Sequence, residues 1–234
     1  MSWLAVCTSF GEEYSVIQSK MVEREDVADG RDARSCRGLF QDTPIELIMM
    51  GIGEKGVGRL QRLDWSDYMG FLHLGYCGGL DSSLEVGDLI FPERCLNLEG
   101  ESLEFETLHL LLKAPKKVSP GVILTSDRLI RTQSEKAKLF ESTGAAAVDM
   151  ESFLLVKAAQ EKGLSAVVLK AVADSRADEL PEFGPPFDEE SLRKGKVNAP
   201  DLTRRWRENM DQARLSLAMA ADQLVPALHQ IWSF

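Results

Sequence analysis

Three acidic residues occupy positions in this sequence where a carboxyl group could do chemistry. Glu13 ends a pair of glutamates near the start of the chain, whereas Glu151 and Asp174 each follow directly on an apolar run. A partly buried carboxylic acid can donate a proton near neutral pH, and an ionised carboxylate can activate water or accept hydrogen bonds from hydroxyl groups. Together these residues could hold a sugar and assist the departure of its leaving group.

A glycine-rich segment, residues 75–88, lies between the first of these acids and the other two. Gly78 and Gly79 would let a ligand approach the backbone closely, because neither residue has a side chain. Gly87 and Asp88 then turn the chain into the next apolar run. Taken alone, the segment is equally compatible with a ligand-binding loop and with a structural turn.

A second glycine motif, residues 51–56, matches the G-x-G-x-x-G pattern of dinucleotide-binding folds. A nicotinamide site also requires an acidic residue at the tip of the next strand, and here that strand ends in Gly75 and Tyr76. The motif therefore favours a tight turn at the start of a helix, which could still face an anion or a ribose.

The bulk composition is that of an ordinary globular protein: 234 residues, 44% hydrophobic and 27% charged. Its formal charge of −10 excludes non-specific binding to nucleic acid, which needs a basic surface. The N-terminus has no basic region typical of a signal peptide, and no apolar stretch is long enough to span a membrane. The cysteines and histidines are scattered, so we expect reduced thiols, no metal, no cofactor and a cytoplasmic location.

The acids and glycines must be positioned by an alternation of strands and helices. Short apolar runs typical of buried strands cover 3–8, 45–50, 71–75, 86–91, 118–124, 145–150 and 166–173. Helical patterns cover 54–68, 134–142 and 151–162, the last ending at Gly163. This alternation predicts a single α/β domain over 1–234, a three-layer α/β/α sandwich around a central mixed sheet.

The C-terminal part has a different character. Residues 175–200 contain four prolines and predict a long loop or lid, with at most a short helix near 188–192. Residues 201–232 predict a long amphipathic helix, which we expect Pro226 to kink or end.

At this point the motifs resemble those of a known family, the methylthioadenosine/S-adenosylhomocysteine nucleosidases within the nucleoside phosphorylase and nucleosidase superfamily. Their signature Gly-Gly-Leu-x-x-x-Leu-x-x-Gly-Asp is reproduced by residues 78–88. Further similarities, in family order, are the acidic loop 11–13, the glycine turn 51–54, the pair Met150 and Glu151, and Asp174 at a late strand end. The resemblance implies the phosphorylase/hydrolase-like fold, a small-molecule nucleoside substrate and a homo-oligomer, dimer or trimer.

The resemblance also implies a role for each matching residue. Asp174 would protonate the leaving purine, Glu151 would accept hydrogen bonds from the ribose hydroxyls, and Glu13 would activate water, with Glu12 as the fallback. The simpler alternatives are a turn cap for Asp174, a helix N-terminal acid for Glu151 and plain surface for Glu13. The remaining substrate-binding positions implied by the family are Gly53, Tyr76, Gly78, Gly79, Leu129, Ile130 and Met150.

The loop before Glu13 bears on the choice between hydrolysis and phosphorolysis. Phosphorylases of the superfamily hold phosphate there with a Gly-Asp-Pro sequence and a downstream arginine, whereas this chain has two glutamates and no arginine before Arg24. A glutamate repels phosphate and suits water, so hydrolysis is favoured. The alternatives are a phosphate-dependent purine nucleoside phosphorylase and, from another class, a non-catalytic nucleoside-binding protein.

Three departures from the family bear on the substrate. Leu129 replaces a phenylalanine that stacks on the base, Tyr76 replaces a small hydroxyl residue near the ribose, and the region 95–119 is short. A more open pocket suggests a bulky or amphipathic 5′ group on adenosine. Segments 134–137, 143–152 and 174–181 are most similar to the hopanoid-biosynthesis-associated branch, while futalosine-type and methylthioadenosine-type substrates stay open.

Overall fold

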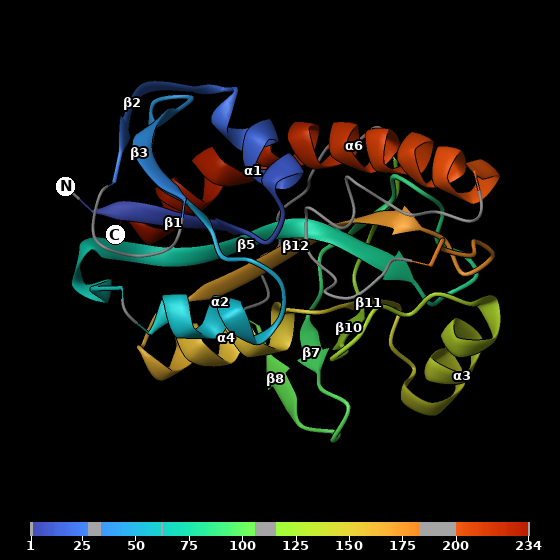
Figure 1. The fold of residues 1–234 in the computed structure, drawn as a ribbon. Coiled ribbons are helices and arrows are strands. Elements are labelled where there is room, and N and C mark those ends of the chain that lie inside the picture. Colours follow the sequence, from blue (N-terminus) through green and yellow to red (C-terminus); the bar gives the residue numbers. More distant parts are fainter. Residues whose placement is uncertain (1, 28–33, 62, 106–115, 183–199, 234) are drawn as a thin grey trace.

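The computed structural model describes residues 2–27, 34–61, 63–105, 116–182 and 200–233. They form one mixed sheet of twelve strands, with β2-β3-β4-β1-β5-β11-β10-β7-β8 in order and β12, β6 and β9 joined to it through β5. Helices α1 and α6 lie on one side of the central strands, and α2 and α4 lie on the other (Figure 1). The predicted three-layer α/β/α arrangement with a mixed sheet is confirmed.

Three parallel strands form the centre of the sheet: β1 (Trp3–Thr8), β5 (Tyr68–Gly79) and β12 (Ala166–Asp174). Every residue of β12 is buried, because helices cover both faces of the sheet. Strand β5 pairs with β1 along its first half and with β12 along most of its length. Parallel pairing brings the carboxyl ends of the strands to the same edge, where Asp174 lies beside Gly78.

Shorter strands extend the sheet on either side of this centre. They are β2 (Met21–Asp26), β3 (Ser35–Phe40), β4 (Thr43–Met49), β6 (Leu89–Ile90), β7 (Arg94–Leu96), β8 (Ser102–Glu104), β9 (Val118–Ser119), β10 (Val122–Thr125) and β11 (Ala147–Asp149). The sequence pattern did not indicate β2, β3, β7 or β8. The residues of β2 after Met21 are exposed and mostly charged, as is typical of an edge strand, so they leave no apolar run to detect.

The helices are α1 (Gly11–Gln18), α2 (Glu54–Leu60), α3 (Gln133–Thr143), α4 (Ser152–Glu161) and α6 (Pro200–Trp232). Helix α3 begins with a capping box in which Thr132, the N-cap residue, and Glu135 accept hydrogen bonds from each other's backbone amides. Helix α4 starts directly after Glu151 and is followed by Gly163 in the left-handed conformation, as predicted.

Three predicted elements were wrong in extent. The helix expected over 54–68 ends at Leu60, and β5 already begins at Tyr68 because its first residues pair with β1. The strand expected over 118–124 is divided at Gly121, where the backbone has φ 151°, into β9 and β10. The strand expected over 86–91 is reduced to β6, because a turn containing Gly87 precedes it.

Helix α6 runs through Pro226 without ending there, so the prediction of a helix end at this residue was wrong. Its apolar face packs on the sheet as expected, with Ala213, Leu217 and Leu224 fully buried. None of the described helices is long and apolar enough to cross a membrane. Most of the predicted loop or lid 175–200, including the short helix expected near 188–192, lies outside the described residues.

The end of α6 depends on a glycine in β5. A Cβ atom placed on Gly70 would lie 2.2 Å from Cε3 of Trp232 and 2.4 Å from its Cζ3. We expect Gly70→Ala to lower the free energy of unfolding by about 1–3 kcal/mol, because the indole must leave its packing site. Urea denaturation would measure this loss.

The matched control is Gly58→Ala in α2, where a Cβ atom would meet nothing within 4 Å. Replacing a glycine inside a helix by alanine should be neutral or stabilise the protein by about 0.5–1 kcal/mol. Equal stabilities of the two variants would show that the end of α6 does not depend on Gly70.

Candidate functional site

A cavity of about 400 Å³ lies at the carboxyl ends of β5 and β12 and beneath the first turns of α6. Strand β5 contributes one wall and the junction of β11 with α4 contributes another. The predicted site residues that line it are Tyr76, Gly78, Leu129, Met150, Glu151 and Asp174. The fold thus brings together positions from four separate parts of the sequence.

The other four predicted residues lie behind the cavity wall. The amide of Gly53 donates a hydrogen bond to Oε1 of Glu151 at 3.3 Å, so the glycine turn contacts the acid and does not itself line the cavity. Gly79 pairs with Ala147 in the sheet, and Ile130 is buried in a small apolar cluster. Glu13 is also buried, whereas its neighbour Glu12 lines the cavity.

Glu13 is held by backbone amides on both carboxylate oxygens. Oε2 accepts from the amides of Ser9 at 2.8 Å and Phe10 at 3.0 Å, and Oε1 accepts from the amide of Tyr76 at 2.8 Å. The residue is 1% exposed. Burial raises the pKa of Glu13, and the positive charge of Lys170 and the three amides oppose that rise. Glu13 is therefore a fixed internal carboxyl group, and the interpretation of it as plain surface was wrong.

The positively charged ammonium group of Lys170 in β12 lies close to Glu13 and Glu151, and this side chain is 1% exposed. Its Nζ lies 3.0 Å from Oδ2 of Asp149 and 4.0 Å from Oε2 of Glu151. A Cβ atom on Gly75 would lie 2.8 Å from Oε1 of Glu13 and 3.0 Å from the same Nζ. Lys170 therefore lies among three carboxyl groups, and a glycine is required at position 75 to leave room for them.

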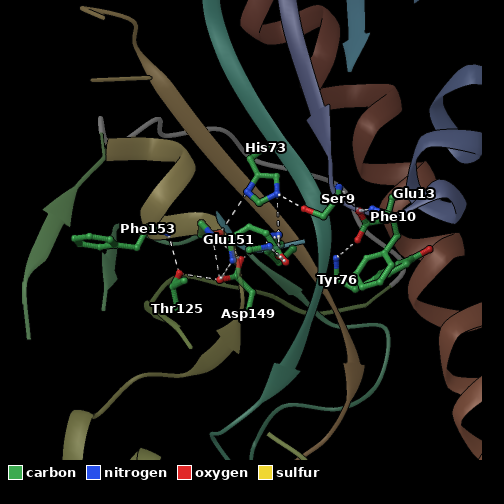
Figure 2. Close-up of polar contacts among 12 residues, drawn as sticks. Ser9, Phe10, Glu13, His73, Tyr76, Thr125, Asp149, Glu151 and Phe153 are labelled. Carbon is green, nitrogen blue, oxygen red and sulfur yellow. Dashed lines mark hydrogen bonds and ion pairs between the residues drawn. The ribbon is translucent and has the colours of Figure 1, made fainter. Parts of the chain in front are cut away.

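His73 completes this buried cluster (Figure 2). Its Nε2 lies 3.1 Å from Nζ of Lys170 and 3.4 Å from the hydroxyl of Ser9, and its Nδ1 lies 3.5 Å from the hydroxyl of Ser152. Burial lowers the pKa of His73 well below its usual value, and Lys170 lowers it further. The ring is therefore neutral and lies in the core with polar groups beside both ring nitrogens. The described residues contain no cluster of ligands able to hold a metal ion.

Glu151 lies at the N-cap position of α4 and is one of the residues that line the cavity. Burial raises its pKa to about 8; Lys170 opposes the rise, whereas Asp149 and Glu13 add to it. Asp149 is fixed by the hydroxyl of Thr125 at 2.9 Å and by the amide of Ser152. Glu151 thus occupies a helix N-terminus, as one interpretation predicted, and also faces the cavity, as the other required.

Asp174 ends β12 at the other side of the cavity. A Cβ atom on Gly78 would lie 3.0 Å from its Oδ2, so this glycine also leaves room for a carboxyl group. Burial raises the pKa of Asp174, and an ion pair with Lys136 opposes the rise. The turn that follows is capped by Asp178, which accepts from the amide and the hydroxyl of Ser175. The described contacts therefore give Asp174 no part in capping that turn.

Two glycines of β5, Gly75 and Gly78, each lie beside a buried carboxyl group. Gly75 lies beside Glu13, Gly78 lies beside Asp174, and residues three apart in a strand are separated by about 10 Å. Glu151 faces the cavity from the opposite wall. Asp174 and Glu151 therefore line one cavity together, whereas Glu13 is held behind its wall by the backbone amide of Tyr76, a lining residue.

Sequence reasoning missed the two lysines that contact these acids. Lys170 had a signal, because it is the only charged residue between Ala166 and Ala173 in a fully buried strand. Lys136 had none, because the surrounding helix is rich in charged residues. Trp206 and Met210 of α6, which cover the cavity, were expected only as part of an amphipathic helix. Part of the short region 95–119, namely 106–115, lies outside the described residues.

Comparisons with known proteins place this geometry among nucleoside-processing enzymes. Two curated relatives are a guanosine phosphorylase of Halorubrum lacusprofundi, 24% identical over 73% of this chain and 82% of its own, and an aminodeoxyfutalosine nucleosidase of Campylobacter jejuni, 28% identical over 55% of this chain and 64% of its own.

Two solved structures share the fold at low identity. The 5′-methylthioadenosine/S-adenosylhomocysteine nucleosidase of Neisseria meningitidis, in complex with methylthio-immucillin-A, superposes with a TM-score of 0.74 at 17% identity, over 97% of this chain and all of that one. The futalosine hydrolase of Helicobacter pylori, as a mutant, gives 0.71 at 16%, over 98% of this chain and all of that one.

The model of the phosphorylase superfamily matches residues 4–206, which include Glu13, Glu151, Asp174 and all of the described sheet except Trp3. The resemblance inferred from the glycine signature and the acidic residues is thereby confirmed. The chain belongs to the phosphorylase superfamily.

Proposed function

We propose that the protein is a nucleosidase, which hydrolyses the N-glycosidic bond of a purine nucleoside and releases the free base. The observation that carries this proposal is the pair of buried acids, Asp174 and Glu151, that line one cavity, with a third buried acid, Glu13, bound to the backbone behind its wall. Similarity to nucleosidases in fold, and to a nucleosidase and phosphorylases in sequence, supports it.

Each acid has a role that its surroundings support. Asp174, whose pKa is raised, gives its proton to the base as the C–N bond breaks. Glu151 accepts hydrogen bonds from the ribose hydroxyls and thereby orients the sugar. Water then attacks the anomeric carbon and gives a proton to a glutamate at the other end. Glu13 is the better-held candidate for this base and Glu12 the more accessible one.

The charge of the site favours water over phosphate as the nucleophile. Lys170, the cation nearest Glu13, is already surrounded by Asp149, Glu151 and Glu13 itself. Among the described lining residues the only basic one is Arg207, on α6. A phosphate ion would therefore enter a site with an excess of negative charge. Phosphorolysis is the second candidate, because one curated relative is a guanosine phosphorylase.

The lining of the cavity supports a 5′-modified adenosine as the substrate. The lining includes the large apolar residues Phe10, Leu180, Trp206 and Met210. Such surface would bind an apolar or amphipathic group on the sugar. The homo-oligomeric state and the cytoplasmic location stay predictions, as does the single-domain organisation.

The first prediction from this proposal concerns base release. Incubation with adenosine derivatives, including 5′-alkylated ones, should yield free adenine and a reducing sugar at the same rate with and without inorganic phosphate. Chromatography of the products measures both. Release that requires phosphate and yields ribose 1-phosphate would establish the phosphorylase instead. Binding without release from any nucleoside would make this a nucleoside-binding protein.

The second prediction concerns the acid. Asp174→Asn should lower kcat by about 10²–10⁴-fold with little change in nucleoside affinity, because the amide cannot donate the proton that the leaving base needs. Asp127→Asn is the matched control, since Asp127 is exposed in the loop before Leu129. Steady-state kinetics compares the two. An Asp174→Asn variant as active as the control would remove Asp174 from the mechanism.

The third prediction concerns the pKa of about 8 for Glu151. Between the ordinary glutamate value of 4.5 and about 8, the folded protein keeps a proton on Glu151 that the unfolded chain has lost. The stabilising contribution of that proton is complete below 4.5 and is lost as the pH rises through 8. Stability should therefore fall more steeply over this range in the wild type than in Glu151→Gln.

Urea denaturation at pH 5.5, 7 and 8.5 would measure both slopes, with Glu12→Gln as the control for loss of a nearby carboxylate. The other buried acids titrate in all three proteins, so the difference between slopes isolates Glu151. A Glu151→Gln variant whose stability falls as steeply as the wild type would contradict the assignment.

A further inference from the structure

Lys136 of α3 is a buried lysine that the proposed mechanism does not use. Its side chain has no exposed surface. The ammonium group donates to the carbonyl oxygens of Ser175 at 2.7 Å and Asp178 at 2.9 Å, and its Nζ lies 2.5 Å from Oδ2 of Asp174. Two of its three protons have carbonyl partners, and Asp174 contacts the same ammonium group as an ion pair.

Among the charged groups around Asp174, Lys136 supplies the positive charge in direct contact with its carboxyl group. Asp178, which follows β12, is paired with Arg205 of α6 at 2.7 Å and accepts from Ser175. On the sheet side the neighbour is Cys77 of β5, whose pKa burial raises well above its usual value, so the thiol is neutral. Across the cavity lie Asp149 and Glu151, which are close to Lys170.

Resting on the function proposed above, we propose that Lys136 is a positioning residue that prepares Asp174 to give up its proton. Its ammonium holds Oδ2, which leaves Oδ1 to face the leaving base. When the C–N bond breaks, the proton of Asp174 passes to the base and the bonding electron pair goes with the base. The carboxylate that forms is then paired with the ammonium already in place, and Lys136 keeps all its protons.

This arrangement addresses a difficulty of any buried general acid. Burial keeps the proton on Asp174, but it also makes the carboxylate that remains after proton transfer unfavourable. A cation in contact with that carboxylate lowers this cost in the transition state, since charges interact more strongly away from water. The two carbonyl partners fix the ammonium, so no reorganisation is needed as the negative charge develops.

Lys136→Met, which removes the charge and keeps most of the volume, tests the proposal with the base-release assay. We expect kcat to fall at least about tenfold with KM changed less than about threefold, because only the transition state gains from the ion pair. The alkaline limb of the kcat–pH profile should move to higher pH, because without the cation Asp174 holds its proton more tightly. Lys136→Arg, which keeps the charge, should keep the wild-type limb.

The matched control is Lys138→Met. Lys138 is an exposed lysine two residues further along the same helix, so this variant should behave as the wild type. In an Asp174→Asn background, Lys136→Met should cause little further loss of rate, because Lys136 acts through Asp174. Full additivity of the two losses, or an unmoved alkaline limb in Lys136→Met, would overturn the proposal and leave Lys136 a structural residue.

A readout independent of turnover covers the case in which Lys136→Met is too slow to assay. Carbon-13 NMR of carboxyl-labelled aspartate, with Asp174→Asn to assign the signal, should show Asp174 titrating at higher pH in Lys136→Met than in the wild type. Thermal melting checks that the variant is folded. If it is not, the same titration in Lys136→Gln decides, and an unshifted Asp174 signal overturns the proposal.

The failure of this inference and that of the proposed function are distinguishable. If the wild type releases no base from any nucleoside, both fall. If the wild type is active and Asp174→Asn is not, but Lys136→Met keeps the wild-type profile, then Asp174 remains the acid and only the role of Lys136 is lost.

Discussion

The site depends on one buried positive charge, the ammonium group of Lys170. Asp149, Glu151 and Glu13 come from different elements, and each would be costly to bury without a counter-charge. Because Lys170 lies in the central strand β12, it holds these acids around the middle of the sheet. Removing it would leave several acids buried without a cation, so the elements that carry them could not come as close together.

A second lysine has the same relation to the other end of the cavity. Lys136 contacts Asp174 much as Lys170 contacts the acids near the sugar position, and both ammonium groups are fully buried. The two clusters differ in the number of acids around the cation. Lys170 lies among Asp149, Glu151 and Glu13, whereas Lys136 is paired with Asp174 alone among the described acids.

The glycines of β5 allow this crowding of charge. Gly75 leaves space for the carboxyl of Glu13 and the ammonium of Lys170, and Gly78 leaves space for the carboxyl of Asp174. Any side chain at either position would displace a charged group from its partners. The glycine signature of this family is therefore explained here by the groups behind the strand as much as by a ligand in front of it. Tyr76 lies between the two glycines in β5 and lines the cavity, and Figure 2 shows its ring on the side of the strand that faces α6.

Much of this could be predicted from the sequence, because short-range patterns record which residues are buried. The alternating apolar runs predicted the α/β/α architecture, and the family resemblance carried by the glycine signature, Glu151 and Asp174 predicted six of the residues that line the cavity. The edge strand β2 and the first residues of the central strand β5 were not predicted. Their conformation is fixed by pairing with distant strands and not by a local pattern. The contacts of Lys170 and Lys136 were decided by the tertiary structure alone. A lysine has the same local pattern whether it is solvated or buried, and only the packed sheet and helices determine which carboxyl groups surround it.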